Sequence, residues 1–418
     1  MDAGTGEVAS PDADDDGLSV GERAMAHLLQ AAHLTAPDRL AELLTVHAAP
    51  LGARRVTVYL ADLRHVVLVP LESREGGERQ ALRIDGTIAG RAFRTLTVLS
   101  APNDDGGHRV WLPLVDGTVR LGVLELTMAP QQGGLNETAL IRCRILAQIT
   151  GLMIISKGSY SDTFARLRRR EPMDLSAELE WALMPPQTVA TDQVVVTAAL
   201  EPAYRVGGDA YDFSLIHDKL HMSLFDAAGH DLTAGLAASI AMAASRNTRR
   251  SGGHLTDIAL LADQAITQQN LDERFITALL GVLDLMTGRL TWVNCGHPPP
   301  LLIRQERVVK ELIRPPSPPI GLLGGDVPAT HTEDLQPGDR LLLYTDGVVE
   351  ARTTAGDLFG LHRLADTIIR TTATGISAPE ALRRLVHGLL AEHAERLTDD
   401  ATIMLVEWRP DDPGALAT

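Results

Sequence analysis

The sequence contains few cysteines and no excess of positive charge. Only Cys143 and Cys295 are cysteines among its 418 residues, and they lie far apart without a CxxC spacing. Neither a disulfide framework nor a thiolate zinc site is therefore indicated. The formal net charge is −16. This charge argues against sequence-independent binding to nucleic acid or to an anionic membrane, because both need a basic surface.

Long apolar runs are also scarce. We find no run near the roughly 18–20 apolar residues that a membrane span requires, and no apolar segment after a basic N-terminus. We therefore expect a soluble, cytoplasmic protein in a reducing compartment. The composition, 45% hydrophobic and 22% charged, is typical of a folded protein, and the length predicts two or three domains.

The first 157 residues predict an acidic tail and one α+β domain. Residues 1–20 carry acidic residues without a lysine or arginine, which predicts a disordered tail. A helical pattern from Gly21 to about Pro50 is followed by strand-like runs at residues 55–61, 65–71, 96–101, 110–115 and 120–128. A closing helix is expected from Asn136 to Ser156, with an apolar stripe of Ile141, Ile145, Ile149, Leu152 and Met153.

This order of elements resembles a GAF domain over residues 21–157, through its layout and the segment GTIAGRAFRTLTVLSA at residues 86–101. The resemblance implies a sensor domain, although no ligand motif is found in it. His65 and His108 are interpreted as surface residues. Cys143 is expected in the core, where free cysteine is usually inert.

Residues 158–187 predict a helical linker in two parts, split near Pro172. The first part is basic, and the second, DLSAELEWALMPP, ends at a double proline. Two interpretations stay open here. The linker is either a solvated connection or a signalling helix that pairs with its copy in a homodimer.

Strands and helices alternate in the second half, from residue 188 to 410, before a loose tail at residues 411–418. Strands are expected at residues 193–199, 220–225, 275–285, 290–294, 301–303, 340–344 and 402–408. Helices are expected at residues 232–249, 255–270, 361–370 and 379–393.

Acidic residues recur at the ends of these strands. Asp209 and Asp226 lie beside glycine turns, Asp346 follows an apolar strand and enters a glycine turn, and Asp399-Asp400 precede the last strand. Each is, taken alone, an ordinary turn aspartate. Carboxylates at one edge of a sheet would, however, raise one another's pKa unless cations lay between them. Oxygen ligands favour Mg²⁺ or Mn²⁺, and two such ions about 3.5–4 Å apart suit phosphoester hydrolysis.

Seven segments resemble, in order and spacing, the bacterial SpoIIE/RsbU class of PP2C-type (PPM) serine/threonine phosphatases over residues 174–409. They are EPAYRVGGDAYDF, FDAAGH, FITALLGVLDLMTGRLTWVNCGHPPPLLI, PPIGLL, PGDRLLLYTDGVVEAR, Phe359-Gly360 and TDDATIML. The resemblance implies an α/β/β/α sandwich that hydrolyses phosphoserine or phosphothreonine. It further implies a STAS-type anti-anti-sigma factor as the substrate and the GAF-like domain as the regulator.

The resemblance also implies roles for individual residues. The two Mn²⁺ or Mg²⁺ ions would be held by Asp209, Asp226, the Ala227 backbone carbonyl, Asp346 and Asp399, with Asp400 as the alternative to Asp399. The nucleophile would be a metal-bridging water. Arg205 is the nearest candidate for binding substrate. We interpret the matching Asn294, Gly296 and His297 as a structural turn, and Asp231 stands where the family often has glycine.

Other functions explain the sequence less well. Cys295 has no following arginine to cradle phosphate, as a cysteine phosphatase would need. GGDAY is similar to the GGDEF hairpin of nucleotide cyclases, but Ala210 replaces its acidic residue, and no GxxxxGK loop occurs. The alternative that remains is a catalytically inactive, phosphatase-like binding or signalling module. The presence of every expected acidic residue argues against it.

Overall fold

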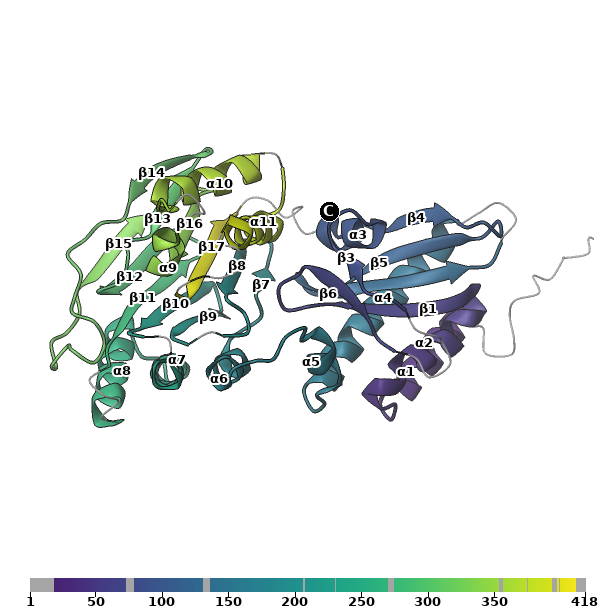
Figure 1. Ribbon diagram of the computed structural model, residues 1–418, viewed down its shortest axis with the longest axis horizontal. Helices are drawn as coiled ribbons and strands as arrows, with labels where there is room; N and C mark the ends of the chain where they lie inside the picture. Colours follow the sequence, from purple (N-terminus) through teal and green to yellow (C-terminus); the bar gives the residue numbers. More distant parts are fainter. Residues whose placement is uncertain are drawn as a thin grey trace, which may run out of the picture. The chain divides into compact units, whose positions relative to one another are not determined.

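The chain folds into two compact units, which divide between Arg170 and Glu171 (Figure 1). The computed structural model describes residues 19–72, 79–130, 136–205, 207–229, 231–269, 274–352, 356–373, 375–392, 397 and 399–410. The two predicted tails therefore lie outside the described residues, apart from Ser19 and Val20. The predicted helical linker spans the division, and it is split into two helices where expected. The helix α5 (Thr163–Arg168) belongs to the first unit, and α6 (Leu175–Leu183) belongs to the second.

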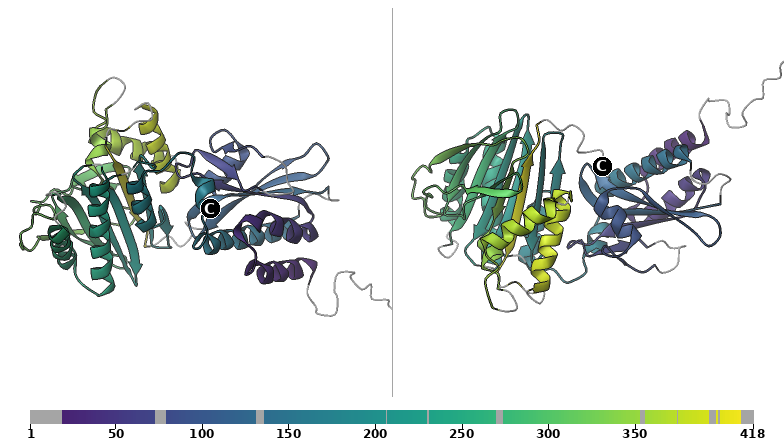
Figure 2. Two further views of the ribbon diagram at one scale, coloured as in Figure 1. Left: turned by 60° about the horizontal axis from the view of Figure 1, so that its bottom comes forward. Right: turned by 90° about the horizontal axis from the view of Figure 1, so that it is seen from above.

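The N-terminal unit is a six-stranded antiparallel sheet in the order β3-β2-β1-β6-β5-β4, with helices on both faces (Figures 1 and 2). Its strands are β1 (Ala53–Ala61), β2 (Val67–Pro70), β3 (Leu82–Arg83), β4 (Leu99–Pro102), β5 (His108–Asp116) and β6 (Val119–Met128). Its helices are α1 (Val20–Ala32), η1 (Pro37–Arg39), α2 (Leu40–Ala48), η2 (Ala49–Leu51), α3 (Ile88–Thr95), α4 (Glu137–Gly158) and α5. The predicted α+β layout is confirmed, whereas β3 and α3 were not expected.

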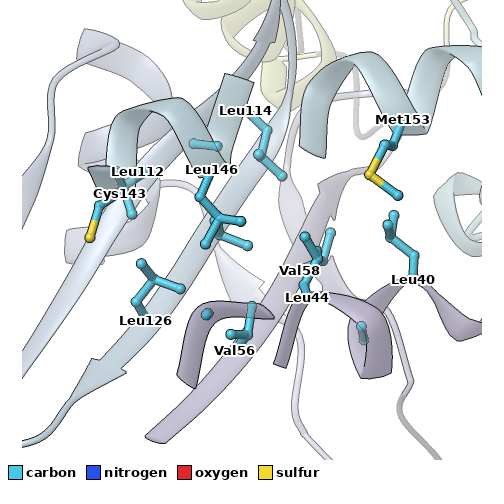
Figure 3. Close-up of a cluster of buried hydrophobic side chains, with 14 of the residues drawn as sticks. Leu40, Leu44, Val56, Val58, Leu112, Leu114, Leu126, Cys143, Leu146 and Met153 are labelled. Carbon is cyan, nitrogen blue, oxygen red and sulfur yellow. The ribbon is translucent and has the colours of Figure 1, made fainter. Parts of the chain in front are cut away.

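The larger core of this unit lies between the sheet and the helices α1, α2 and α4 (Figure 3). Leu40 and Leu44 of α2 and Val56 and Val58 of β1 are buried there. Cys143 also lies in this core, as predicted, and burial raises the pKa of its thiol to about 11. A thiol that is buried and protonated is unreactive.

The apolar stripe predicted for α4 was right for Met153, which is buried, and for Ile149, which packs against the core, but wrong for its other three residues. The helix itself and its Asn136 cap are confirmed. The Asn136 side chain accepts from the Ala139 N–H at 2.8 Å. Ile141, Ile145 and Leu152 are 47%, 40% and 61% exposed. The buried face instead includes polar residues such as Thr150 and Lys157, whose ammonium group donates to the carbonyls of Ala32 and Thr35. Apolar residues surround α4, so their spacing did not define its buried face.

Two further expectations for this unit need correction. By length and composition, α4 is long and apolar enough to span a membrane, and it is the one such helix among the described residues. This is weak evidence for a span, because the helix packs on β5 as a core helix does. His65 and His108 are half-buried rather than surface residues, and the His65 ring lies edge-on to Phe93, 5.3 Å between centroids.

The C-terminal unit consists of two antiparallel sheets packed face to face. The first has the order β15-β12-β11-β10-β9, and the second has the order β14-β13-β16-β17-β8-β7. Tyr211, Leu224 and Trp292 of the first sheet share a buried cluster with Leu343 and Met404 of the second. The helices α7 and α8 cover the outer face of the first sheet, and α10 and α11 cover that of the second (Figures 1 and 2). The predicted α/β/β/α sandwich is confirmed.

The structure of this unit contains every strand and helix that the sequence predicted, together with some that were not expected. The first sheet contains β9 (Asp209–Ile216), β10 (Lys219–Ala227), β11 (Ile276–Asp284), β12 (Arg289–Cys295) and β15 (Thr330–Asp334). The second contains β7 (Thr188–Ala190), β8 (Val194–Glu201), β13 (Leu301–Arg304), β14 (Arg307–Glu311), β16 (Arg340–Tyr344) and β17 (Ala401–Trp408). The helices are α6, α7 (Leu232–Arg250), α8 (Leu255–Gln269), α9 (Asp346–Glu350), α10 (Leu361–Ala373) and α11 (Ala378–Glu392). The strands β7, β9, β14 and β15 and the helix α9 were not expected.

Candidate active site

The antiparallel register pairs Asp209 directly with Asp226 across β9 and β10. Opposed residues of an antiparallel pair point to the same face, with Cβ atoms about 4.5–5.5 Å apart. That face is the interior of the sandwich, because Tyr211 and Leu224, each two residues along its strand, lie in the core between the sheets. The two acids therefore sit at one edge of the sandwich, between its sheets.

Two threonines of the second sheet hold the Asp209 carboxylate. The hydroxyls of Thr345, which follows β16, and Thr402 of β17 each donate to Asp209 Oδ2 at 2.7 Å. The Thr402 N–H in turn donates to Thr345 Oγ1 at 2.9 Å. Neither threonine was singled out in the sequence, although each lies within three residues of a predicted acidic ligand. Together they join Asp209 to the opposite sheet.

Asp399 and Asp400 have different surroundings. Asp400 is buried, and its Oδ2 accepts the backbone N–H groups of Gly207 at 2.8 Å and Asp209 at 3.4 Å. Asp399 is exposed, and its Oδ1 accepts the N–H of Asp400 at 3.0 Å. Asp400 thus stabilises the backbone that leads into β9, while Asp399 is the more accessible of the two to a ligand.

Close backbone contacts bring the separate acidic segments together. A Cβ on Gly347, directly after Asp346, would lie 1.9 Å from the Asp400 carbonyl oxygen. A Cβ on Gly208 would lie 2.9 Å from the Ala227 carbonyl oxygen. Only glycine permits these approaches. Asp346 begins the short helix α9, so the turn expected at this residue is corrected to a helix start.

Burial and mutual repulsion raise the pKa values of these acids. The pKa of Asp226 rises to about 7, first because of burial and then because of Asp346, Asp399 and Asp400. Burial, followed by the charges of Asp226 and Asp400, raises the pKa of Asp209 well above its usual value. The pKa of Asp346 is also raised, by burial and then by Glu350 and Asp399. The acids therefore form one electrostatically linked cluster.

A divalent cation suits the chemistry of this cluster, because its donors are carboxylate and carbonyl oxygens. A positive charge would also offset the repulsion that raises these pKa values. Among the described residues, no group of three histidine, cysteine or acidic side chains is already arranged to hold a metal ion. The ligand set is therefore part of the proposal below.

The Asn294–His297 segment connects the two sheets next to Asp226, through the contacts of the His297 ring. His297 Nδ1 lies 2.7 Å from the hydroxyl of Thr277, which is the β11 partner of Asp226. His297 Nε2 lies 3.1 Å from the Tyr344 carbonyl oxygen, so Nε2 carries the proton. Burial lowers the pKa of His297 to about 3, and the ring is neutral at physiological pH. Asn294 donates to the His297 carbonyl at 2.8 Å. These contacts are those of a structural turn.

Arg274 is a second arginine beside the cluster, and it was not predicted from the sequence. Its guanidinium donates to the Ala228 carbonyl and, at 2.7 Å, to Asp231 Oδ2. Asp231 also caps α7, because its Oδ1 accepts the Ala234 N–H at 3.0 Å. The negative charge of Asp231 is thus paired at the surface. Arg205, the predicted substrate-binding residue, is exposed two residues before Gly207.

Glu180 of α6 is an unexpected buried acid in this unit. Its side chain is 0% exposed, and neither carboxylate oxygen has a hydrogen-bond partner among the described residues. A Cβ on Gly235 of α7 would lie 3.0 Å from Glu180 Oε1. Burial, and then the charge of Asp400, raise the pKa of Glu180 to about 9. The group is therefore protonated at neutral pH.

Comparison with known proteins identifies the family of this unit. The family model for stage II sporulation protein E (SpoIIE) matches residues 217–409. This part of the chain is a SpoIIE-family domain. The matched residues include Asp226, Asp346, Asp399 and Asp400, while Asp209 lies just before them. The predicted SpoIIE/RsbU-type membership is confirmed.

Three curated relatives match parts of the chain. Protein IcfG of Synechocystis is 25% identical, over 57% of this chain and 42% of that protein. Phosphoserine phosphatase RsbU of Bacillus subtilis is 24% identical, over 56% of this chain and 70% of RsbU. Phosphoserine phosphatase RsbP of the same organism is 26% identical, over 39% and 42%. The chain thus spans less than half the length of IcfG and RsbP.

Solved structures of related domains cover the same part of the chain. The SiaA-PP2C domain of Pseudomonas aeruginosa has 24% identity and a TM-score of 0.44, over 51% of this chain and 85% of that one. The phosphatase domain of SpoIIE from Bacillus subtilis has 18% identity and a TM-score of 0.37, over 54% and 97%. The architecture of the SpoIIE-family domain described above rests on its own strand order.

Proposed function

We propose that the SpoIIE-family domain is a metal-dependent phosphatase that hydrolyses phosphoserine or phosphothreonine on proteins. The observation that carries this proposal is the acidic cluster at the sandwich edge, in which burial and mutual repulsion raise the pKa values of Asp209, Asp226 and Asp346. Two Mn²⁺ or Mg²⁺ ions, held by these residues, Asp399 and the Ala227 carbonyl, would supply an activated water and polarise the phosphoryl oxygen.

The residues around the cluster have distinct tasks in this proposal. Thr345 and Thr402 fix the Asp209 carboxylate by two hydroxyl donors. The His297–Thr277 contact fixes the strand position opposite Asp226. Preorganised ligands of this kind lower the cost of assembling a site. The exposed Arg205 would bind the substrate phosphate or its flanking residues.

We further propose that the substrate is a phosphorylated STAS-type protein and that the GAF-like unit, residues 21–157, regulates its hydrolysis. Two relatives are named phosphoserine phosphatases, which supports a phosphoserine substrate. The helix α6, which opens the C-terminal unit, contacts α7 beside the acidic cluster. A regulatory signal that moved α6 would therefore reach α7 directly.

The substrate proposal is tested by phosphate release from a phosphorylated STAS-type protein, a phosphoserine peptide and p-nitrophenyl phosphate. We expect faster hydrolysis of the STAS-type protein than of the peptide. A variant that begins at Glu171 should keep p-nitrophenyl phosphatase activity but lose regulation. Metal binding without hydrolysis of any substrate would favour the alternative, an inactive binding or signalling module.

The chain is also proposed to form a homodimer through the helical linker and α4, which leads into it. Ile141, Ile145, Leu152 and Ile155 of α4 are exposed, and their spacing of four, seven and three residues is that of a coiled-coil seam. The double variant Ile145→Glu/Leu152→Glu should be monomeric in light scattering, whereas Arg144→Glu should remain dimeric. A monomeric wild-type chain would contradict this proposal.

A further inference from the structure

A cavity lies at the opposite end of the first sheet from the acidic cluster. It has a volume of about 580 Å³ and lies between the outer face of the sheet and the turn that joins α7 to α8. Lys219 and His221 of β10 line it. They precede Asp226 by seven and five residues, which corresponds to roughly 17–23 Å along a strand. The cavity is therefore separate from the proposed phosphatase site.

The charged lining of this cavity is entirely basic. Lys219, His221, Arg249 and His254 line it, and no acidic residue is among its described lining residues. The chain as a whole carries a formal net charge of −16. A described lining with basic groups and no carboxylate favours an anionic ligand.

His221 lies close to the other basic groups of the cavity. Its Nδ1 is buried and has no hydrogen-bond partner among the described residues. Burial lowers the pKa of His221, and the positive charges of Arg249 and Lys219 lower it further. An uncompensated buried nitrogen beside two cations would gain from a bound acceptor group.

Three carboxylates near the cavity have hydrogen-bond partners of their own. Asp212 accepts from Arg249 at 2.8 Å and from Arg246 at 2.7 Å. Asp257 accepts the His254 N–H at 2.7 Å. Asp284 is the strand partner of Lys219 across β10 and β11. Its carboxylate accepts from Thr287 at 2.9 Å, and these hydrogen bonds, followed by the charge of Lys219, lower its pKa. Because the single carboxylate of Asp212 pairs with both Arg246 and Arg249, a net positive charge remains at this end of α7.

The start of α8 adds backbone donors. Leu255 and Thr256, the first residues of this fifteen-residue helix, line the cavity, and the N–H groups of a first helical turn attract anions. Ile216, Ile258 and Val282 supply an apolar wall. The lining therefore combines a cationic end with an apolar surface.

We infer that this cavity binds a small organic anion, with its phosphate or carboxylate group at Lys219, His221 and the start of α8 and its apolar part against Ile258 and Val282. The inference does not depend on the phosphatase activity. Arg249, near the end of α7, lines the cavity, and Asp231 caps the start of the same helix beside the acidic cluster. A bound anion would thus stabilise a helix that also contacts the proposed active site.

The test uses the full chain in a chelator, so that metal ions do not recruit the probes to the acidic cluster. Phenylphosphonate, which cannot be hydrolysed, and phthalate are titrated separately by calorimetry. We expect at least one of them to bind, and the tighter of the two identifies the anionic group. In Lys219→Ala and His254→Ala, both exposed sites, the affinity should fall about tenfold or more.

The matched control is Arg250→Ala, which removes a neighbouring exposed charge that does not line the cavity and should bind as wild type does. Circular dichroism verifies that each variant is folded. The inference is overturned if neither probe binds the wild-type chain. Equal losses in Lys219→Ala and Arg250→Ala would also overturn it, because they would indicate general charge attraction rather than this cavity.

Discussion

Replacing Glu180 by glutamine is expected to change the pH dependence of folding. The wild-type carboxyl is fully buried in α6 without a hydrogen-bond partner among the described residues, and its pKa is raised to about 9. Glutamine has nearly the same shape but cannot ionise. The substitution therefore isolates the cost of burying this ionisable group.

Proton linkage gives the sign and the size of this change in stability with pH. An unfolded glutamate loses its proton near pH 4.5, whereas the folded protein keeps the proton on Glu180 until about pH 9. Between these values the folded state binds one more proton, so its stability falls as pH rises. Each pH unit corresponds to about 1.4 kcal/mol. From pH 5 to pH 8, the Glu180→Gln variant should thus gain roughly 4 kcal/mol relative to wild type.

Urea unfolding measures this difference at both pH values in the presence of a chelator. Three of the four tryptophans, Trp181, Trp292 and Trp408, lie in the C-terminal unit and report on it by fluorescence. Glu178→Gln, an exposed change on the same helix, is the matched control and should show no such gain. A difference between wild type and Glu180→Gln that stays constant from pH 5 to pH 8 would refute the reasoning.

Two further predictions concern the acidic cluster. Thr402→Val removes one of the two hydroxyl donors to the buried Asp209 and should lower the free energy of unfolding by roughly 2 kcal/mol. The control is Thr332→Val, at an exposed position. An equal loss of stability in both variants would contradict the role of the Thr402 hydroxyl. The pKa of Asp226 near 7 means that protons compete with Mn²⁺ below that pH. Calorimetric affinity for Mn²⁺ should therefore fall on the order of tenfold from pH 8 to pH 6, and an unchanged affinity would show that Asp226 is not a ligand.

The sequence was most informative where a single periodicity dominated. The apolar strands that deliver Asp226 and Asp346, and the final strand β17, were predicted from short hydrophobic runs. The strand β9 was not predicted, although Tyr211, Phe213 and Leu215 alternate with the polar Asp212 and Ser214 and pack on the core between the sheets. The buried face of α4 could not be chosen because apolar side chains surround the helix.

The site residues that could not be predicted are those that depend on contacts between segments far apart in the sequence. Thr345 and Thr402 meet Asp209 from positions 136 and 193 residues away, and no local pattern predicts such a meeting. Glu180 looks like an ordinary solvated glutamate on a helix, since its burial depends on the contact between α6 and α7. The meeting of the acidic residues was predictable because they recur at the ends of strands, and a sheet brings such ends to one edge.

The central claim is that hydrolysis depends on cations held by the acidic cluster. The direct measurement is p-nitrophenyl phosphate hydrolysis with Mn²⁺, with chelator, and in Asp346→Asn with Mn²⁺. The exposed Asp326→Asn is the matched control. We predict turnover in wild type and in Asp326→Asn with Mn²⁺, and loss of turnover in chelator and in Asp346→Asn. Turnover that survives chelation or Asp346→Asn would contradict the account.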